Sequence, residues 1–371
     1  MTDWAKYRAE FPALASQAYL NTAAGAPMSR AAGTAGREYY EATVRDGDVH
    51  WDDWLARVEL VRAQAAPLVG GSSQQIAFVQ NCSAAMNLVA AELGGDGEVV
   101  LVRGDFPSVT YPWMVGGYDV KFVEPDIHGG ADIEALAAAC TDRTRAISVG
   151  WVQYRTGFRY DLNALSAICK KRGIKLVVDT TQGLGAVQFD AESLGVDYMV
   201  CSGYKWLTAG YGMGLLYARE PLDRTRRAAA GWRSSSDPYA LISDDMNLSE
   251  DAPALELGHP PFAAVFALGA ALEMQSEIGA LAIETRVLHL SARLRQALSD
   301  AGLGVLPLSE TDLRSGIVYA EAEADSTALR NELLDRGVYV SARGDGLRCS
   351  THFYNDESDL AKLTEAFATL S

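Results

Sequence analysis

The chain of 371 residues is long enough to bury a substantial core, and its length predicts roughly two domains. Its composition, with 49% hydrophobic and 22% charged residues, is that of an ordinary soluble globular protein. The formal net charge of −16 argues against nucleic acid and anionic membranes as partners, because neither attracts an acidic surface. An anionic ligand must therefore meet a local positive site.

Neither a targeting segment nor a metal site is expected. Residues 1–8 are polar without a following apolar region, and no apolar run reaches the roughly 20 residues of a membrane span. We therefore expect a cytoplasmic protein. The five cysteines have neither the CxxC spacing of a zinc site nor the pattern of a disulfide framework: Cys82, Cys140, Cys169, Cys201 and Cys349.

The first part of the chain contains predicted helices at 4–11, 30–45 and 52–69 and a short apolar strand at 76–79. That strand runs into a turn and then a helix over 84–93. Such an arrangement presents free backbone N–H groups and the Ser83 hydroxyl at a helix N-terminus, which suits a phosphate group. The alternative is that Ser83 is an ordinary helix N-cap.

The middle of the chain alternates strands with helices, which predicts an α/β fold with a largely parallel, doubly wound sheet. The predicted strands are 98–102, 120–123 and 146–152, and the predicted helices are 131–140 and 162–172. Phe106 follows the first of these strands. Its ring could stack on an aromatic cofactor or belong to the core.

Two further strands end in candidate catalytic residues. The apolar run 174–178 ends at Asp179, and the run 196–201 is followed by a break at Gly203 and by Lys205, one of seven lysines. Such strand ends are where open α/β sheets bind ligands, and burial between two aromatic residues would lower the pKa of Lys205. A lysine that forms a Schiff base and an aspartate for the pyridinium nitrogen together hold pyridoxal phosphate. The alternative is a surface lysine on a loop.

After Tyr217 the pattern changes to an irregular stretch over 224–251 and then a smaller α+β C-terminal domain. That domain is expected to contain a long helical segment from Phe262 to about Asp300 and a closing helix over 356–370, with strands at 317–320 and 338–341. We expect three parts: an N-terminal segment, 1–20, that packs on the small domain, a large cofactor-binding domain over 21–257, and the small domain over 258–371.

On these features the chain resembles the class-V aminotransferase family of fold-type I pyridoxal-phosphate enzymes, which includes cysteine desulfurases, kynureninases and isopenicillin N epimerase-like proteins. The resemblance runs nearly end to end, and six motifs agree with the family in order. They are Tyr-Leu-Asn-Thr-Ala-Ala at 19–24, Asn-Cys-Ser-Ala-Ala-Met-Asn at 81–87, Asp-Thr-Thr-Gln at 179–182, Ser-Gly-Tyr-Lys-Trp-Leu at 202–207, Gly-His-Pro at 258–260 and Leu-Arg-Cys-Ser-Thr-His-Phe-Tyr-Asn at 347–355.

The resemblance implies roles around a pyridoxal 5′-phosphate cofactor. Lys205 would carry the cofactor and move the substrate Cα proton, Asp179 would pair with the pyridine nitrogen, and Gln182 would hydrogen-bond the phenolic oxygen. Four residues would hold the phosphate: Cys82 through its backbone N–H, Ser83, Ser202 and Tyr204. Phe106 falls where desulfurases place a ring-stacking histidine. His259 matches a residue that reaches the phosphate of the neighbouring subunit, which implies a homodimer with shared sites.

For an amino-acid substrate, Arg348 matches the arginine that binds the α-carboxylate, a task that suits its bidentate fork. The alternative is a surface salt bridge. Asn21 is expected to border the substrate, and Trp232 to line its pocket or belong to the core. Arg155 and Arg159 could favour a second acidic group on the substrate, although such arginines are more often solvated or ion-paired.

Departures from the family narrow the chemistry. Desulfurases need a nucleophilic cysteine shortly before the carboxylate-binding arginine. Residues 338–348 contain none, and Cys349 should face away from Arg348 along a strand. Transamination is the first choice because it needs no further group. The alternatives are a lyase (C–S β-elimination or kynureninase-like Cβ–Cγ cleavage), an epimerase, and a non-catalytic cofactor-binding homologue.

Overall fold

The computed structural model describes residues 2–369 except 226, 228, 308–313 and 323. Its main sheet has seven strands in the order β2-β8-β7-β6-β5-β3-β4. Only β8 runs antiparallel to its neighbours, and the remaining neighbouring pairs are parallel. The bounds are β2 (Ile76–Val79), β3 (Glu98–Val102), β4 (Asp119–Val123), β5 (Thr144–Gly150), β6 (Lys175–Asp179), β7 (Tyr198–Ser202) and β8 (Gly214–Ala218).

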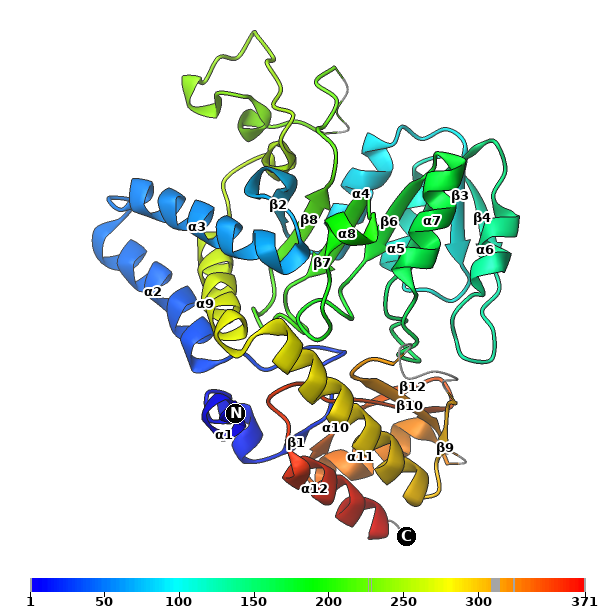
Figure 1. The fold of residues 1–371 in the computed structure, drawn as a ribbon. Helices are drawn as coiled ribbons and strands as arrows, with labels where there is room; N and C mark the ends of the chain where they lie inside the picture. Colours follow the sequence, from blue (N-terminus) through cyan, green and yellow to red (C-terminus); the bar gives the residue numbers. More distant parts are fainter. Residues whose placement is uncertain (1, 226, 228, 308–313, 323, 370–371) are drawn as a thin grey trace.

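Helices cover both faces of this sheet (Figure 1). They include α4 (Cys82–Glu92), α5 (Pro107–Val115), α6 (Ile133–Ala139), α7 (Leu162–Arg172) and α8 (Ala191–Leu194). Along β6, Leu176 and Val178 face the core under α6, α7 and α8, whereas Val177 faces the core under α4 and α5. Because both faces are buried, the strand is apolar throughout and does not alternate. The predicted α/β fold with a mostly parallel sheet is confirmed.

The segment from Phe262 to Asp300 is helical as predicted, but it is not one helix. The segment forms α9 (Phe262–Ile278) and α10 (Ala280–Asp300), which meet at an angle of 84°. Gly279 between them has a φ of +89°, a conformation that residues with a Cβ rarely adopt. Among the described residues, no single helix is long and apolar enough to cross a membrane, and these two pass that test only together, as a bent pair.

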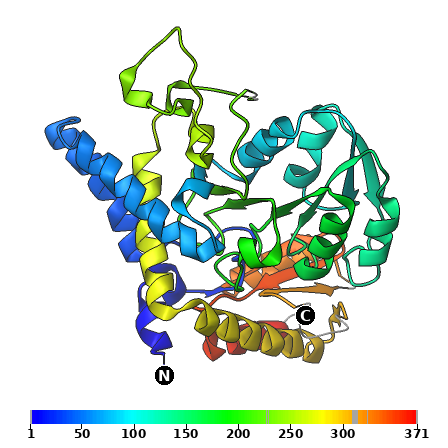
Figure 2. The ribbon, with the colours of Figure 1, turned by 45° about the horizontal axis from the view of Figure 1, so that its top comes forward.

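Two helices, α2 (Arg30–Asp46) and α3 (Trp51–Val69), pack against α9 and project from the main sheet (Figures 1 and 2). The contact is made by buried rings and small side chains. Phe262 on α9 packs its ring against those of Tyr39 and Trp54. The backbone of Gly36 on α2 lies so near α9 that an added Cβ would be 3.2 Å from the Ala263 carbonyl oxygen. Through this contact α9 belongs to the same core as the main sheet.

The C-terminal part is built on a four-stranded antiparallel sheet in the order β12-β13-β10-β9. Its strands are β9 (Gly304–Val305), β10 (Ile317–Glu321), β12 (Ser341–Arg343) and β13 (Gly346–Ser350), and α11 (Ser326–Asp335) and α12 (Glu357–Ala368) accompany it. The N-terminal segment, with α1 (Trp4–Ala9), lies against this part: β1 (Ala18–Tyr19) pairs with β11 (Val338–Tyr339), and Arg8 pairs with Asp359. The exact domain limits remain predictions.

Candidate active site

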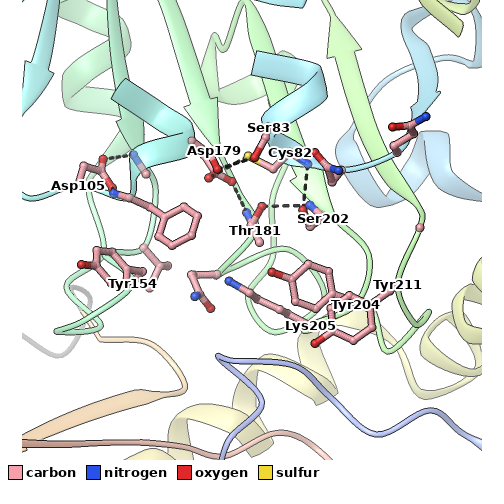
Figure 3. Close-up of a pocket in the computed structure, with 18 residues that line it drawn as sticks. Cys82, Ser83, Asp105, Tyr154, Asp179, Thr181, Ser202, Tyr204, Lys205 and Tyr211 are labelled. Carbon is pink, nitrogen blue, oxygen red and sulfur yellow. Dashed lines mark hydrogen bonds between the residues drawn. The ribbon is translucent and has the colours of Figure 1, made fainter. Parts of the chain in front are cut away.

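A cavity of about 570 Å³ lies at the carboxyl ends of β6 and β7 (Figure 3). Eight of the predicted site residues line it: Cys82, Ser83, Phe106, Asp179, Gln182, Ser202, Tyr204 and Lys205. The described lining residues lie between Gln80 and Gly212, so none of them comes from the small sheet. The lining instead comes from the ends of strands and the beginnings of helices in the main sheet, where the fold brings unpaired backbone groups together.

Lys205 is buried at the cavity, with 6% of its surface exposed. Burial lowers the pKa of its amine to about 8, and the nearby Asp179 carboxylate opposes this shift. Its Nζ atom lies 5.5 Å from the centre of the Tyr204 ring and 5.7 Å from that of Phe106. The uncharged amine that imine formation requires is therefore much more available here than in an exposed lysine.

The turn that carries Lys205 is held in place by hydrogen bonds to the backbone of the next residue, Trp206. The carbonyl oxygen of Trp206 is 2.9 Å from both Gln275 Nε2, which donates to it, and His352 Nε2. His352 is fully buried, and this burial lowers its pKa to about 3, so the ring is neutral and donates through Nε2. These contacts come from α9 and from the segment after β13, and they hold the lysine turn against two separate elements.

Asp179 ends β6 and is held by two hydrogen bonds. One carboxylate oxygen accepts from the Thr181 backbone N–H at 2.8 Å, and the other accepts from the Cys82 thiol at 3.1 Å. Burial and the neighbouring Asp179 charge raise the pKa of the Cys82 thiol, so it stays protonated and acts as a donor. The carboxylate is thus oriented before any ligand binds (Figure 3).

The N-terminus of α4 is capped by Asn81, whose side chain accepts from the Ala84 N–H at 2.9 Å. The alternative that Ser83 is the N-cap is therefore wrong. The Ser83 hydroxyl instead lies 2.6 Å from that of Ser108, and the Cys82 N–H donates to Ser202 Oγ at 2.9 Å. Hydroxyl groups and a helix N-terminus at one end of the cavity form a suitable site for a phosphate.

Gln182 and Phe106 are each anchored at the cavity by neighbours. Gln182 accepts from the Trp206 indole N–H and donates to the Ala23 carbonyl, both at 3.0 Å, which leaves its second amide hydrogen for a ligand. The Asp105 carboxylate accepts from the backbone N–H groups of Phe106 and Gly150, both at 2.7 Å. These bonds fix the backbone position of Phe106. Burial raises the pKa of Asp105 to about 6.

Ten of the eighteen lining residues were not among those predicted, and they include Asp105, Ser108, Thr181 and Tyr211. Asp105 lies three residues after β3, as Lys205 does after β7, so the strand-end argument could have found it. Thr181 lies in the motif 179–182, and Ser108 is two residues after Phe106, so both are close to residues with predicted roles. Tyr211 had no sequence signal. Its ring stacks on that of Tyr204 with a 4.3 Å centroid separation, although 75% of Tyr211 is exposed.

Arg348 on β13 is 2% exposed and does not itself line the cavity. Its Nη1 donates to the carbonyl oxygen of Tyr154, a lining residue, at 2.8 Å. Its Nε and Nη2 atoms have no hydrogen-bond partner among the described residues. Burial, with a smaller effect of Arg343, lowers its pKa to about 9. The buried guanidinium of Arg348 thus has two unpaired donor nitrogens along one edge. A carboxylate could accept hydrogen bonds from both.

Three other predicted site residues do not line this cavity. Asn21 is buried and accepts from the Ser341 hydroxyl at 2.6 Å, which connects it to the small sheet. Trp232 and His259 lie together, with ring centres 5.0 Å apart, and Trp51 contacts His259 at the same separation. His259 is exposed. These two rings therefore belong to a surface cluster apart from the cavity of their own chain.

Comparison with known proteins agrees with this geometry. The profile of the family described as "Aminotransferase class-V" matches residues 18–363. The chain belongs to this family. Among curated relatives, the "Uncharacterized aminotransferase YcbU" of Bacillus subtilis is 27% identical over 98% of this chain and 97% of its own. Isopenicillin N epimerase of Amycolatopsis lactamdurans is 30% identical over 86% of this chain and 85% of its own.

Solved structures show the same fold. The cysteine desulfurase from Thermococcus onnurineus NA1 has a TM-score of 0.88 at 22% identity, over 98% of this chain and 97% of its own. The cystine C–S lyase C-DES has a TM-score of 0.85 at 20% identity, over 97% of this chain and 99% of its own.

Membership of the family confirms the predicted cofactor, pyridoxal 5′-phosphate, and the predicted enzyme class, a transferase or lyase that depends on it. The cavity fits this group. It combines a buried amine with a lowered pKa, an oriented carboxylate, and hydroxyl groups at a helix N-terminus. These are the partners that the aldehyde, the pyridine nitrogen and the phosphate require.

Proposed function

We propose that the protein is an aminotransferase that exchanges the amino group of an amino acid with a 2-oxo acid. The observation that carries this proposal is the open edge of the Arg348 guanidinium, which is buried beside the residues expected to hold the cofactor. A carboxylate bound there in bidentate fashion would orient the α-carbon of the substrate toward Lys205.

We expect the residues of the cavity to have separate roles in binding the cofactor and in moving the proton. When bound, pyridoxal phosphate supplies the electron sink that weakens a bond at the substrate α-carbon. Asp179 would hold the pyridine nitrogen, and the Cys82 N–H with the Ser83 and Ser202 hydroxyls would hold the phosphate. Lys205 Nζ would take and return the α-proton, since its lowered pKa of about 8 leaves part of it uncharged near neutral pH.

The position of the cysteines favours a transferase over a persulfide-forming desulfurase. Cys349 lies in the core of the small domain, on the face of β13 opposite to Arg348, and is fully buried. Burial raises the pKa of its thiol to about 12. Such a thiol is neither accessible nor ionised, and both properties are needed in a sulfur nucleophile.

We further propose a cytoplasmic homodimer in which each subunit completes the site of the other. The exposed His259 and the half-buried Trp232 and Trp51 form a cluster apart from the cavity of their own chain. Tyr211 is largely exposed although it stacks on a residue of the cavity wall. A second subunit that covers the cavity mouth would bury Tyr211 and bring His259 to the phosphate end.

The test is isotope transfer from ¹⁵N-labelled L-amino acids to unlabelled 2-oxo acids, with the products separated and weighed by mass spectrometry. Transamination predicts labelled product amino acid and one 2-oxo acid for each donor consumed. Pyruvate released without an acceptor would identify a lyase, and a D-amino acid would identify an epimerase. If the cofactor binds and none of these products forms, the protein is a non-catalytic cofactor-binding homologue.

A further inference from the structure

We infer that the substrate carries a second anionic group, on its side chain, and that Arg155 and Arg343 recognise it. This inference rests on the proposed function, since it concerns the amino acid that Arg348 would bind by its α-carboxylate. The substrate class is then an amino acid with a carboxylate, sulfonate or phosphate on its side chain. The inference is drawn from three arginines near the cavity that have no ion-pair partner among the described residues: Arg155, Arg343 and Arg348.

Arg343 lies at the end of β12, on the same face of the small sheet as Arg348. Ser341 is the register partner of Arg348, and Arg343 follows two residues later, opposite Gly346. Side chains two residues apart on a strand share a face. Because Gly346 has no side chain, nothing on β13 stands directly opposite Arg343. The positive charge of Arg343 also contributes to lowering the pKa of Arg348, which is consistent with two side chains on one face of the sheet.

Arg155 reaches the same place from the large domain. It follows Tyr154, the lining residue whose carbonyl oxygen accepts from Arg348. Its guanidinium lies 4.8 Å from the centre of the Tyr319 ring, and its Nη2 donates to the Tyr319 hydroxyl at 2.9 Å. Tyr319 is the β10 register partner of Arg348. The three arginines therefore surround one short stretch of the small sheet.

The turn between β12 and β13 permits this approach. An added Cβ at Gly344 would lie 3.1 Å from Arg155 Nη2, and Gly344 has a φ of +55°. A larger residue there would be strained and would press on the guanidinium. The Tyr319 hydroxyl, which accepts from Arg155, donates to the Arg343 carbonyl at 3.1 Å. Arg155, Tyr319 and Arg343 thus form one connected group.

The charge of this group is not balanced by the protein. Within the described part of the chain, no carboxylate oxygen lies within 4 Å of a nitrogen of Arg155, Arg343 or Arg348, whereas the neighbouring Arg159 pairs with Glu284 at 3.3 Å. Asp345 has only a minor effect on the pKa of Arg155, and it forms no ion pair with another described residue. The Arg155 Nε atom is buried without a partner.

An unpaired buried cation such as Arg348 is costly, and Arg155 and Arg343 are half-buried, in a chain whose net charge is −16. An α-carboxylate would neutralise one guanidinium. A second anionic group on the same ligand would provide a counter-ion for the other two. The ligand that satisfies the whole group therefore carries two anionic groups, and not one.

Matched pairs of amino acids test this inference on the cofactor-loaded enzyme: L-glutamate against L-glutamine, L-aspartate against L-asparagine, and phospho-L-serine against L-serine. We expect kcat/KM to favour one anionic member by about 10-fold or more, the range that a desolvated charge pair supports. In Arg155→Gln and Arg343→Gln this preference should fall by about 10-fold. Arg293→Gln, an exposed arginine of α10, is the matched control and should keep it.

A preference near one in the unsubstituted enzyme, or one that survives in both variants, would overturn the inference. Turnover of neutral amino acids alone would do so while leaving the proposed aminotransferase intact. If no amino acid reacts, calorimetry with glutarate and its monoamide separates the two questions. Tighter binding of glutarate that is lost in the two variants supports the anion site. Equal binding of both compounds contradicts it.

Discussion

The two sides of the cavity differ in how their polar groups are satisfied. On the cofactor side, in the large domain, the groups bond to one another: Asp179 accepts from Thr181 and Cys82, and Ser202 accepts from the Cys82 N–H. On the side of the small sheet, Arg348 and Arg155 keep buried nitrogen atoms without partners in the described residues. The first side is organised without a ligand. The second requires an anion to complete its hydrogen bonds.

This difference separates the roles of the two sides. A preorganised set of donors and acceptors holds a permanently bound group with little loss of conformational entropy. An unpaired guanidinium carries a desolvation cost that only an arriving anion removes, so it discriminates strongly between ligands. We therefore expect substitutions on the cofactor side to abolish the reaction, and those on the substrate side to change which amino acids react.

The largest effect is expected from Lys205→Ala. Removing the amine eliminates both the covalent attachment of the cofactor and the transfer of the α-proton, which should lower kcat by about 10³-fold or more. Isotope transfer from labelled amino acid measures it. Lys121→Ala, at a lysine whose side chain is 40% exposed, is the control and should keep full activity. Full activity in the Lys205 variant would contradict the assignment of this side of the cavity to cofactor binding.

Arg348→Met should lower kcat/KM by about 30- to 1,000-fold for every amino acid, because the α-carboxylate loses its charged partner. The same change removes a buried charge that lacks an anion. The free energy of unfolding measured without substrate should therefore stay constant or rise. Denaturant titration alongside kinetics checks both. A loss of activity together with a large loss of stability would indicate a structural role.

The pH dependence of cofactor uptake tests the cofactor side more finely. Only the uncharged amine of Lys205 reacts, and its pKa is lowered to about 8. The uncharged fraction in the cofactor-free protein is roughly one tenth at pH 7 and one half at pH 8. The rate of reconstitution with pyridoxal phosphate, followed by absorbance, should thus rise about fivefold over this interval and level off above about pH 9. A rate that keeps rising to pH 10.5 would mean an unperturbed lysine.

The smallest effect on activity is expected from Cys349→Ser. Because Cys349 faces the core and not the cavity, kcat should change by less than about twofold. The buried hydroxyl should lower the free energy of unfolding by about 1–3 kcal/mol. A variant that folds normally but has lost activity would reopen the possibility of persulfide chemistry.

Much of the cofactor side could be predicted from the sequence, because its residues occur in short motifs at the ends of apolar strands. Asp179 ends β6 and Lys205 lies three residues after β7, and the parallel direction of the two strands places both at one edge of the sheet. The roles of Gln182 and the phosphate-end residues came from the family resemblance. Their cofactor contacts remain predictions.

The substrate side could be predicted only in part. Arg348 was identified by its motif, but its open edge depends on which partners a distant loop supplies, and Tyr154 is far from it in the sequence. The sequence also did not separate Arg155 from Arg159, since ion pairing with Glu284 depends on where α10 packs. The sharp bend at Gly279 was missed because apolar residues continue through it.

The most direct test of the central claim is an absorbance spectrum of the purified protein, followed by borohydride reduction and peptide mapping. We predict a visible band that a reactive L-amino acid changes, and a reduced cofactor attached to the peptide that contains Lys205. No band after adding pyridoxal phosphate, or a label on any other lysine, would contradict the assignment of this cavity as the active site.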